Sequence, residues 1–231
     1  MKLKIFTHSL PPDCPEPHLH PTLHISHTGL LADLLICCML LLHRSAFTVE
    51  VFNLIEEKGV YRCNGELSPH LEDKPFKEAY EWLIEKMSEK IGTPPKGVNF
   101  PVWAWHTRNA KRKKPDLRES GYTKRGKKMV CIELEVPDEE VVLSDFDNWH
   151  SVLNKYYCDE SNNEKEWEDI QDWLDTLSPK EREEKIRSSW EQIFDVKYRK
   201  DEWRSNGIFI QATFWELKKE YIRNFQVFTA K

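Results

Sequence analysis

The segment PVWAWHTRNAKRKKPDLRESGYTKRGKKMVCIELEVPDEEVVLSDFDNWH, residues 101–150, decides the fold of this chain. It contains two runs that are typical of strands, PVWAW (101–105) and MVCIELEVP (129–137). Both are rich in β-branched and aromatic residues, and apolar side chains alternate along them. A strongly basic loop joins the two runs. The segment therefore predicts a strand, a charged loop and a second strand.

A helix is predicted directly after the second strand, over SDFDNWHSVLNKYY (144–157), because apolar residues recur there at helical spacing. Ser144 is the expected N-cap, with Asp147 three residues later in the position of a capping box. The same stretch contains a D-x-D motif followed by His150, which is also compatible with a divalent-metal or acid–base cluster. The capping interpretation is the simpler one.

The remaining pattern predicts one α+β domain. Acidic residues dominate the segment around 164–194, where Ser178, Pro179 and Glu181 mark the start of a second helix in a predicted hairpin. Further helices are expected at 48–61, 75–92, 159–177 and 178–194, and further strands at 207–217 and 221–230. We expect a mixed or antiparallel sheet packed against several helices, with an acidic helical hairpin inserted at about 164–194.

Charge is distributed unevenly along the chain. The formal net charge of −5 gives no general attraction to nucleic acid or to an anionic membrane. Residues 108–128, however, carry ten Lys and Arg against two acids, whereas residues 133–191 carry nineteen acids against six Lys and Arg. The two regions are predicted to neutralise each other or to bind partners of opposite charge.

The first 46 residues differ in composition from the rest. They hold six of the nine histidines, and five prolines between positions 11 and 21 disfavour regular structure. The apolar run 30–42 is shorter than the ~20 residues of a membrane span. We expect residues 1–46 to be a disordered or mis-assigned extension, and residues 47–231 to form a single globular domain.

The six cysteines contain no C-x-x-C pair, so we expect reduced thiols and a cytoplasmic protein. The chain also lacks the usual phosphate-loop, dinucleotide, zinc-protease and hydrolase motifs. No metal site is predicted.

Several stretches resemble the bacterial family known as domain of unknown function 3841. They are GVYRCN (59–64), FKEAYEWLIEKM (76–87), PVWAWH (101–106), KPDLRESGY (114–122), CIELEVPDEEVVLSDFDNWHSVLN (131–154) and IQATFWELKKEYI (210–222). Members of that family usually open with a short strand reading like W-T-x-Q, where this chain has SAFTVEV (45–51). The family is uncharacterised, so the resemblance implies no activity and no catalytic residue.

A much weaker similarity links the C-terminal strands to ADP-ribosyltransferase-like toxins. It implies that Glu216 is the catalytic carboxylate, that NAD is the cofactor, and that Arg62 or Arg118 holds the pyrophosphate. Gln211 lies on the opposite face of the predicted strand, so the Q-x-E pair of that family is absent.

The competing hypothesis is a binding module for a nucleotide or nucleic acid, acting through loop 106–128, whose cations lie beside aromatic residues. The candidate ligand-binding residues are Arg62, Trp103, Trp105, His106, Arg108, Arg118 and Tyr122. A structural or protein-interaction role is the third possibility. Any site is expected where loop 106–128 meets the end of strand 207–217, beside Glu216.

Overall fold

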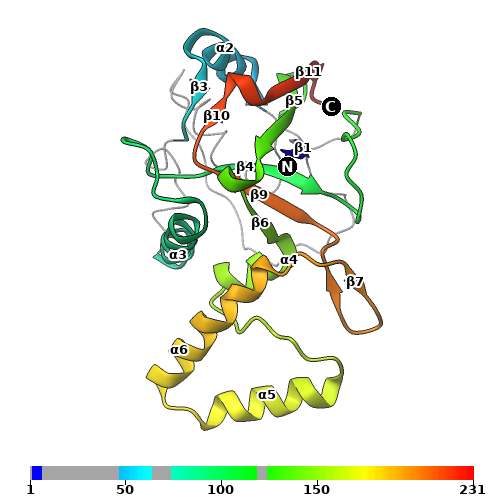
Figure 1. Ribbon diagram of the computed structural model, residues 1–231. Coiled ribbons are helices and arrows are strands. Elements are labelled where there is room, and N and C mark those ends of the chain that lie inside the picture. Colours follow the sequence, from blue (N-terminus) through cyan, green and yellow to red (C-terminus); the bar gives the residue numbers. More distant parts are fainter. Residues whose placement is uncertain (1, 7–46, 64–73, 119–123) are drawn as a thin grey trace.

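The computed structural model describes residues 2–6, 47–63, 74–118 and 124–231 (Figure 1). The helices are α2 (Val49–Lys58), α3 (Lys74–Ile91), α4 (Phe146–Leu153), α5 (Glu164–Thr176) and α6 (Pro179–Ser189), with short 3-10 helices η4 (Asp138–Glu140), η5 (Trp190–Phe194) and η6 (Lys219–Tyr221). The strands are β1 (Lys2–Phe6), β2 (Phe47–Thr48), β3 (Val60–Tyr61), β4 (Val102–Thr107), β5 (Lys128–Pro137), β6 (Val142–Asp145), β7 (Arg199–Lys200), β8 (Ser205–Asn206), β9 (Ile210–Phe214), β10 (Leu217–Lys218) and β11 (Ile222–Thr229).

One seven-stranded sheet forms the centre of the domain. Its order is β11-β5-β1-β4-β9-β6, with β2 also paired to β5. Every pairing in it is antiparallel. Two small ribbons, β3 with β10 and β7 with β8, lie outside this sheet. Helices and an antiparallel sheet in one domain confirm the α+β prediction.

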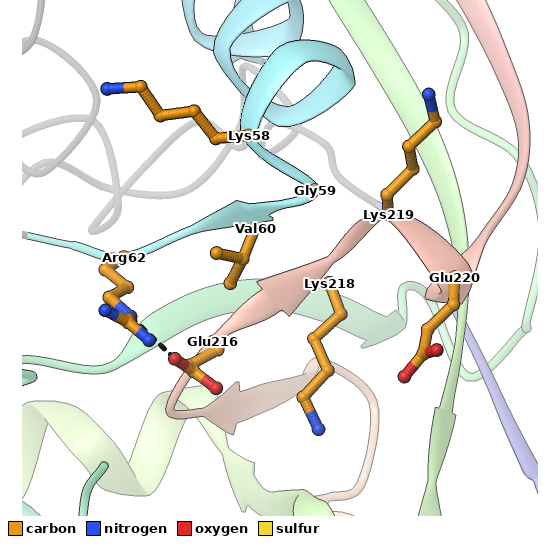
Figure 2. Close-up of a pocket in the computed structure, with 8 residues that line it drawn as sticks. All are labelled: Lys58, Gly59, Val60, Arg62, Glu216, Lys218, Lys219 and Glu220. Atoms are coloured by element: carbon orange, nitrogen blue, oxygen red, sulfur yellow. Dashed lines mark hydrogen bonds and ion pairs between the residues drawn. The ribbon is translucent and has the colours of Figure 1, made fainter. Parts of the chain in front are cut away.

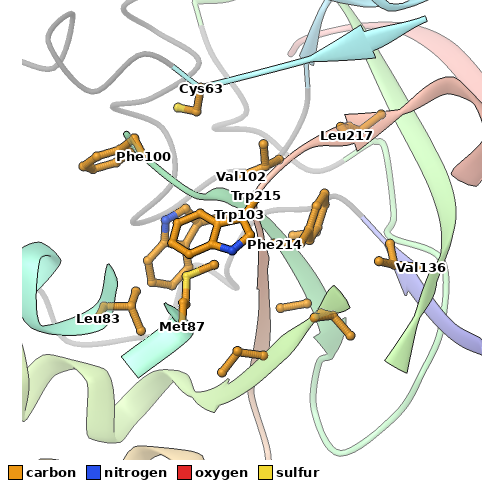
Figure 3. Packing of buried hydrophobic residues seen from close by; sticks show 14 of the residues in the cluster. Cys63, Leu83, Met87, Phe100, Val102, Trp103, Val136, Phe214, Trp215 and Leu217 are labelled. Carbon is orange, nitrogen blue, oxygen red and sulfur yellow. The ribbon is translucent and has the colours of Figure 1, made fainter. Parts of the chain in front are cut away.

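The core lies between the sheet and helices α2, α3 and α4. Trp82, Trp103 and Trp215 are all buried in it, as their strand and helix positions predict. Figure 3 shows Leu83 and Met87 of α3 beside the indole rings of Trp103 and Trp215. Helix α3 therefore covers the face of the sheet to which Trp103 belongs.

Helix α4 begins one residue later than predicted. Ser144 is the third residue of β6 and is fully buried, and the N-cap is Asp145, whose Oδ1 accepts from the backbone N–H of Asn148 at 3.0 Å. The second oxygen of Asp145 accepts from Gly207 N–H at 2.7 Å. Burial raises the pKa of this carboxyl group. The D-x-D motif thus supplies a buried cap that joins α4 to the chain before β9.

Helices α5 and α6 form an arm that extends away from the sheet (Figure 1). The predicted capping box at its turn is confirmed, because Ser178 accepts from Glu181 N–H and the Glu181 carboxylate accepts from Ser178 N–H. Pro179 occupies the first helical turn. The two predicted acidic helices are thus present and extend away from the sheet.

Three findings differ from, or fall outside, the sequence prediction. Residues 2–6 form β1 between β5 and β4, so the expected disorder of residues 1–46 does not hold for this strand. Residues 7–46 lie outside the described part of the chain. Cys131 and Cys158 are buried thiols, as expected, whereas Cys63 is disulfide-bonded. No helix in the described ranges is long and apolar enough to span a membrane.

Candidate functional site

The candidate site is built where α2 turns into β3. Gly59 ends α2 with φ of 76°, a left-handed conformation that favours glycine. The chain then runs directly into β3, which pairs with β10 through Val60 and Lys218. The backbone N–H of Lys219 donates to Gly59 O at 2.8 Å. This short ribbon holds two segments, far apart in the sequence, side by side.

An open pocket of about 600 Å³ lies against this ribbon. Figure 2 shows the side chains around it coming from the end of α2, from β3 and from the segment that follows β9. Its lining residues are Lys58, Gly59, Val60, Arg62, Glu216, Lys218, Lys219 and Glu220. Four cations and two carboxylates thus surround one cavity of a size that suits a small ligand.

Arg62 and Glu216 meet inside this pocket. Arg62 Nε donates to Glu216 Oε1 at 2.6 Å, although the two residues are 154 positions apart (Figure 2). The Arg62 side chain is 49% exposed and that of Glu216 only 13% exposed. Glu216 is thus the more buried member of the pair. The guanidinium is therefore the part of the pair that a ligand reaches first.

Two of the three lysines at the pocket form ion pairs with nearby carboxylates. Lys219 pairs with Glu56 at 2.8 Å, and Lys218 pairs with Glu140 at 2.9 Å. The hydrogen bond to Glu140 is the main reason that the pKa of Lys218 is raised. Lys58 has no ion pair within the described ranges.

The predicted ligand residues of β4 are part of the core. Trp103 and Trp105 are 2% and 1% exposed, and they contact Trp149 and Phe146 of α4. Neither indole can stack on a base that approaches from solvent. These two residues do not join Arg62 at the pocket.

His106 and Arg108, at the end of β4, are buried as well. Burial, together with the nearby charge of Arg112, lowers the pKa of His106 to about 4, so the ring is neutral at physiological pH. The guanidinium of Arg108 lies over the Trp105 ring, 6.0 Å from its centre. Both residues are placed to stabilise the end of the strand.

The loop after β4 begins at the end of β9 that lies away from Glu216. Because β4 and β9 are antiparallel, Thr107 pairs with Ile210 at the start of β9, and Ala110 N–H donates to Ile208 O. Glu216 lies beyond the opposite end of β9. The expectation that loop 106–128 meets the end of this strand beside Glu216 is therefore wrong.

Arg118 is not among the residues that line the pocket. Arg118 binds Asp116 of its own loop through two hydrogen bonds, of 2.8 and 2.6 Å. Tyr122 lies outside the described residues. Of the seven candidates that the structure describes, only Arg62 and Glu216 line this pocket.

Sequence reasoning missed Lys58, Lys218 and Lys219. Only the pairing of two-residue strands brings them to Arg62, and so short a pairing leaves no periodic signal. The one available clue was the pair of lysines immediately after Glu216 and Leu217.

Comparison with known proteins places the chain in a family. The family model described as Domain of unknown function (DUF3841) matches residues 45–223. The chain belongs to this family. All the residues that line the pocket of this DUF3841 protein fall within the matched region. No curated protein and no solved structure matches the chain, so the similarity to ADP-ribosyltransferases has no support from these comparisons.

Proposed function

We propose that this DUF3841 protein binds a small phosphate-bearing ligand, such as a nucleotide, in the pocket between α2, β3 and β10. The observation that carries the proposal is that Arg62 and three lysines line one open cavity of about 600 Å³. These cations come from two segments far apart in the sequence, and a backbone ribbon fixes their separation.

Arg62 is the expected phosphate ligand. A guanidinium presents parallel N–H groups that match two phosphate oxygens. The arginine side chain in its ion pair with Glu216 is half-exposed, and exposed ion pairs contribute at most about 1 kcal/mol to the stability of the fold. A phosphate can therefore replace the carboxylate on Arg62, while Lys58 supplies positive charge that no ion pair within the described residues neutralises.

Glu216 is expected to accept a hydrogen bond from a hydroxyl of the ligand. Its side chain lines the pocket, is only 13% exposed and lies beside Arg62, which would bind the phosphate. A ligand that combines a phosphate with a sugar would use both residues. A bare phosphate would use Arg62 and the lysines alone.

Isothermal titration with pyrophosphate and with ADP tests this proposal. Arg62→Ala is expected to weaken both ligands by roughly 10- to 100-fold, since a hydrogen bond to a charged group contributes about 1.5–3 kcal/mol. Arg62→Lys keeps the charge but loses the planar fork, so it should weaken binding less. Arg118→Ala, an exposed arginine with its own carboxylate partner, is the matched control. Equal affinity in wild type and Arg62→Ala would refute the proposal.

NAD-dependent ADP-ribosyl transfer is the alternative, and its one favourable observation is that Arg62 and Glu216 share a pocket. In that reaction Glu216 would stabilise the cationic sugar as nicotinamide departs. Incubation with labelled NAD and cellular RNA, DNA and protein tests it, and Glu216→Gln should abolish any transferred label. The absence of label with wild-type protein would leave ligand binding as the function of the pocket.

Nucleic-acid binding through loop 106–128 is a separate proposal, supported by the four consecutive exposed cations Lys111 to Lys114. Because Trp103 and Trp105 are buried, such binding would use phosphates only. Affinity for a single-stranded oligonucleotide should then fall steeply between 50 and 200 mM salt. Replacement of these four residues by alanine should remove binding, and unchanged affinity would refute this role.

A further inference from the structure

Helix α5 has an unusual combination of surface residues. It carries six acids and one lysine over thirteen residues, and only Leu174 among them is buried. It also exposes two tryptophans, with Trp167 44% and Trp173 39% accessible. Burial of such large aromatic side chains by a partner would contribute substantial binding free energy.

The apolar side of α5 is covered at one end and open at the other. Trp167, Ile170 and Leu174 follow one another at helical spacing and form a single stripe. Leu174 is buried, Ile170 is half-buried and Trp167 is exposed, so the stripe opens to solvent toward the N-terminus of the helix. Trp173 lies beside the covered end, where its ring meets the edge of Tyr157.

The arm is held in a fixed position while this face stays open. At the base of the arm, Trp190 packs edge-to-face against Trp82 of α3, and Arg187 pairs with Glu85. At the other end, Trp203 of the β7–β8 hairpin donates to Ser161, just before α5. Figure 1 shows α5 as the helix farthest from the sheet. The stripe is therefore presented on a supported element.

The charges beside the stripe are not neutralised by the rest of the arm. Asp175 pairs with Arg182, and Lys180 pairs with Glu184. Glu164, one turn before Trp167, and Glu168, directly after it, have no ion pair in the portion of the chain that the structure describes. The open aromatic stripe is thus bordered by free negative charge.

We propose that the α5 face binds a basic amphipathic helix of a partner protein. The apolar side chains of the partner would cover Trp167 and extend the stripe, while its Lys and Arg side chains would pair with Glu164 and Glu168. An anionic lipid surface and nucleic acid are both repelled by this charge. The chain's own exposed basic run, Lys111–Lys114, has no apolar residue and cannot supply the second half of the contact.

Fluorescence anisotropy with a labelled 14-residue Leu/Lys peptide of helical periodicity tests the proposal on the full chain. Saturable one-to-one binding is expected, with no binding of the Leu/Glu peptide of the same spacing or of an all-Lys peptide. Trp167→Ala and the pair Glu164→Lys with Glu168→Lys should each weaken binding at least tenfold. Tyr198→Ala and Glu57→Lys, at exposed positions outside α5, should leave it unchanged.

Three results would overturn the proposal. The first is equal affinity of wild type and Trp167→Ala, with both proteins shown to be folded by their melting temperatures. The second is equal binding of the all-Lys peptide, which would mean that charge alone acts. The third is a wild-type dimer in light scattering that Trp167→Ala converts to a monomer, because the stripe would then be an interface between copies of this chain.

Discussion

Replacement of Trp82 by alanine is the sharpest test of the packing between the domain and its arm. The indole is 2% exposed, lies edge-to-face with Trp190 at 5.5 Å and stacks on Phe194 at 5.8 Å. Large-to-small substitution of a buried tryptophan costs about 3–5 kcal/mol, as lost burial and a residual cavity combine. Because α3 and η5 share this contact, Trp82→Ala should loosen the base of the arm as well as the core.

The assay is urea unfolding followed by circular dichroism, with calorimetry for the melting temperature. A loss of about 3–5 kcal/mol corresponds to a fall of roughly 6–20 °C for a chain of this size. Trp167→Ala removes the same side chain from an exposed position and should change the unfolding free energy by less than about 0.5 kcal/mol. A loss below about 1 kcal/mol for Trp82→Ala, or equal losses for the two variants, would refute the packing described for α3 and η5.

Other predictions concern the sheet and its connections. Burial lowers the pKa of His106 to about 4, so between pH 6.5 and pH 4 the unfolded chain binds more protons than the folded one. The unfolding free energy should therefore fall by about 3 kcal/mol as the pH is lowered over that range. Urea titrations at each pH should show that His106→Asn lacks this part of the loss. Gly207→Ala should lower the unfolding free energy by more than 2 kcal/mol in the same assay, because its Cβ would lie 2.7 Å from Val196 O. Gly59→Ala, whose Cβ would meet no atom within 4 Å, should lower it by only about 1 kcal/mol. Similar losses for the two variants would contradict this geometry. Deletion of residues 1–6 removes β1 from between β5 and β4 and should lower the melting temperature by more than 10 °C, and an unchanged melting temperature would show that the sheet closes without it.

Much of the fold follows from local patterns. Apolar spacing and caps predict α3 and α6, because Pro and Ser mark their first turns and glycine or a new cap marks their ends. Alternation likewise predicts β5 and β9. The strands β1 and β6 escaped prediction for a physical reason: β6 has only four residues, and β1 depends on pairing with strands more than ninety positions away. Because β6 escapes prediction, the sequence pattern indicates Ser144 as the N-cap of α4, whereas the structure has Asp145 in that position.

The candidate site was only partly predictable. Arg62 and Glu216 were selected for their chemistry, and the β3–β10 ribbon joins them. Trp103 and Trp105 were selected because they neighbour the basic loop, but alternation cannot tell whether one face of a strand or both are covered. In this sheet both faces of β4 are buried, so its aromatic residues serve the core. Which cations surround Glu216 depended on long-range pairing that no local pattern contains.

The most direct test of the proposed site follows the side-chain Nε–H resonance of Arg62 by nuclear magnetic resonance as pyrophosphate is added. This group donates to Glu216 in the free protein, and the resonance can be assigned by its loss in Arg62→Lys. We predict a saturable shift of this resonance as phosphate replaces the carboxylate, while the Nε–H resonance of Arg118 stays in place. An unmoved Arg62 resonance at pyrophosphate concentrations in the millimolar range would contradict the proposed function.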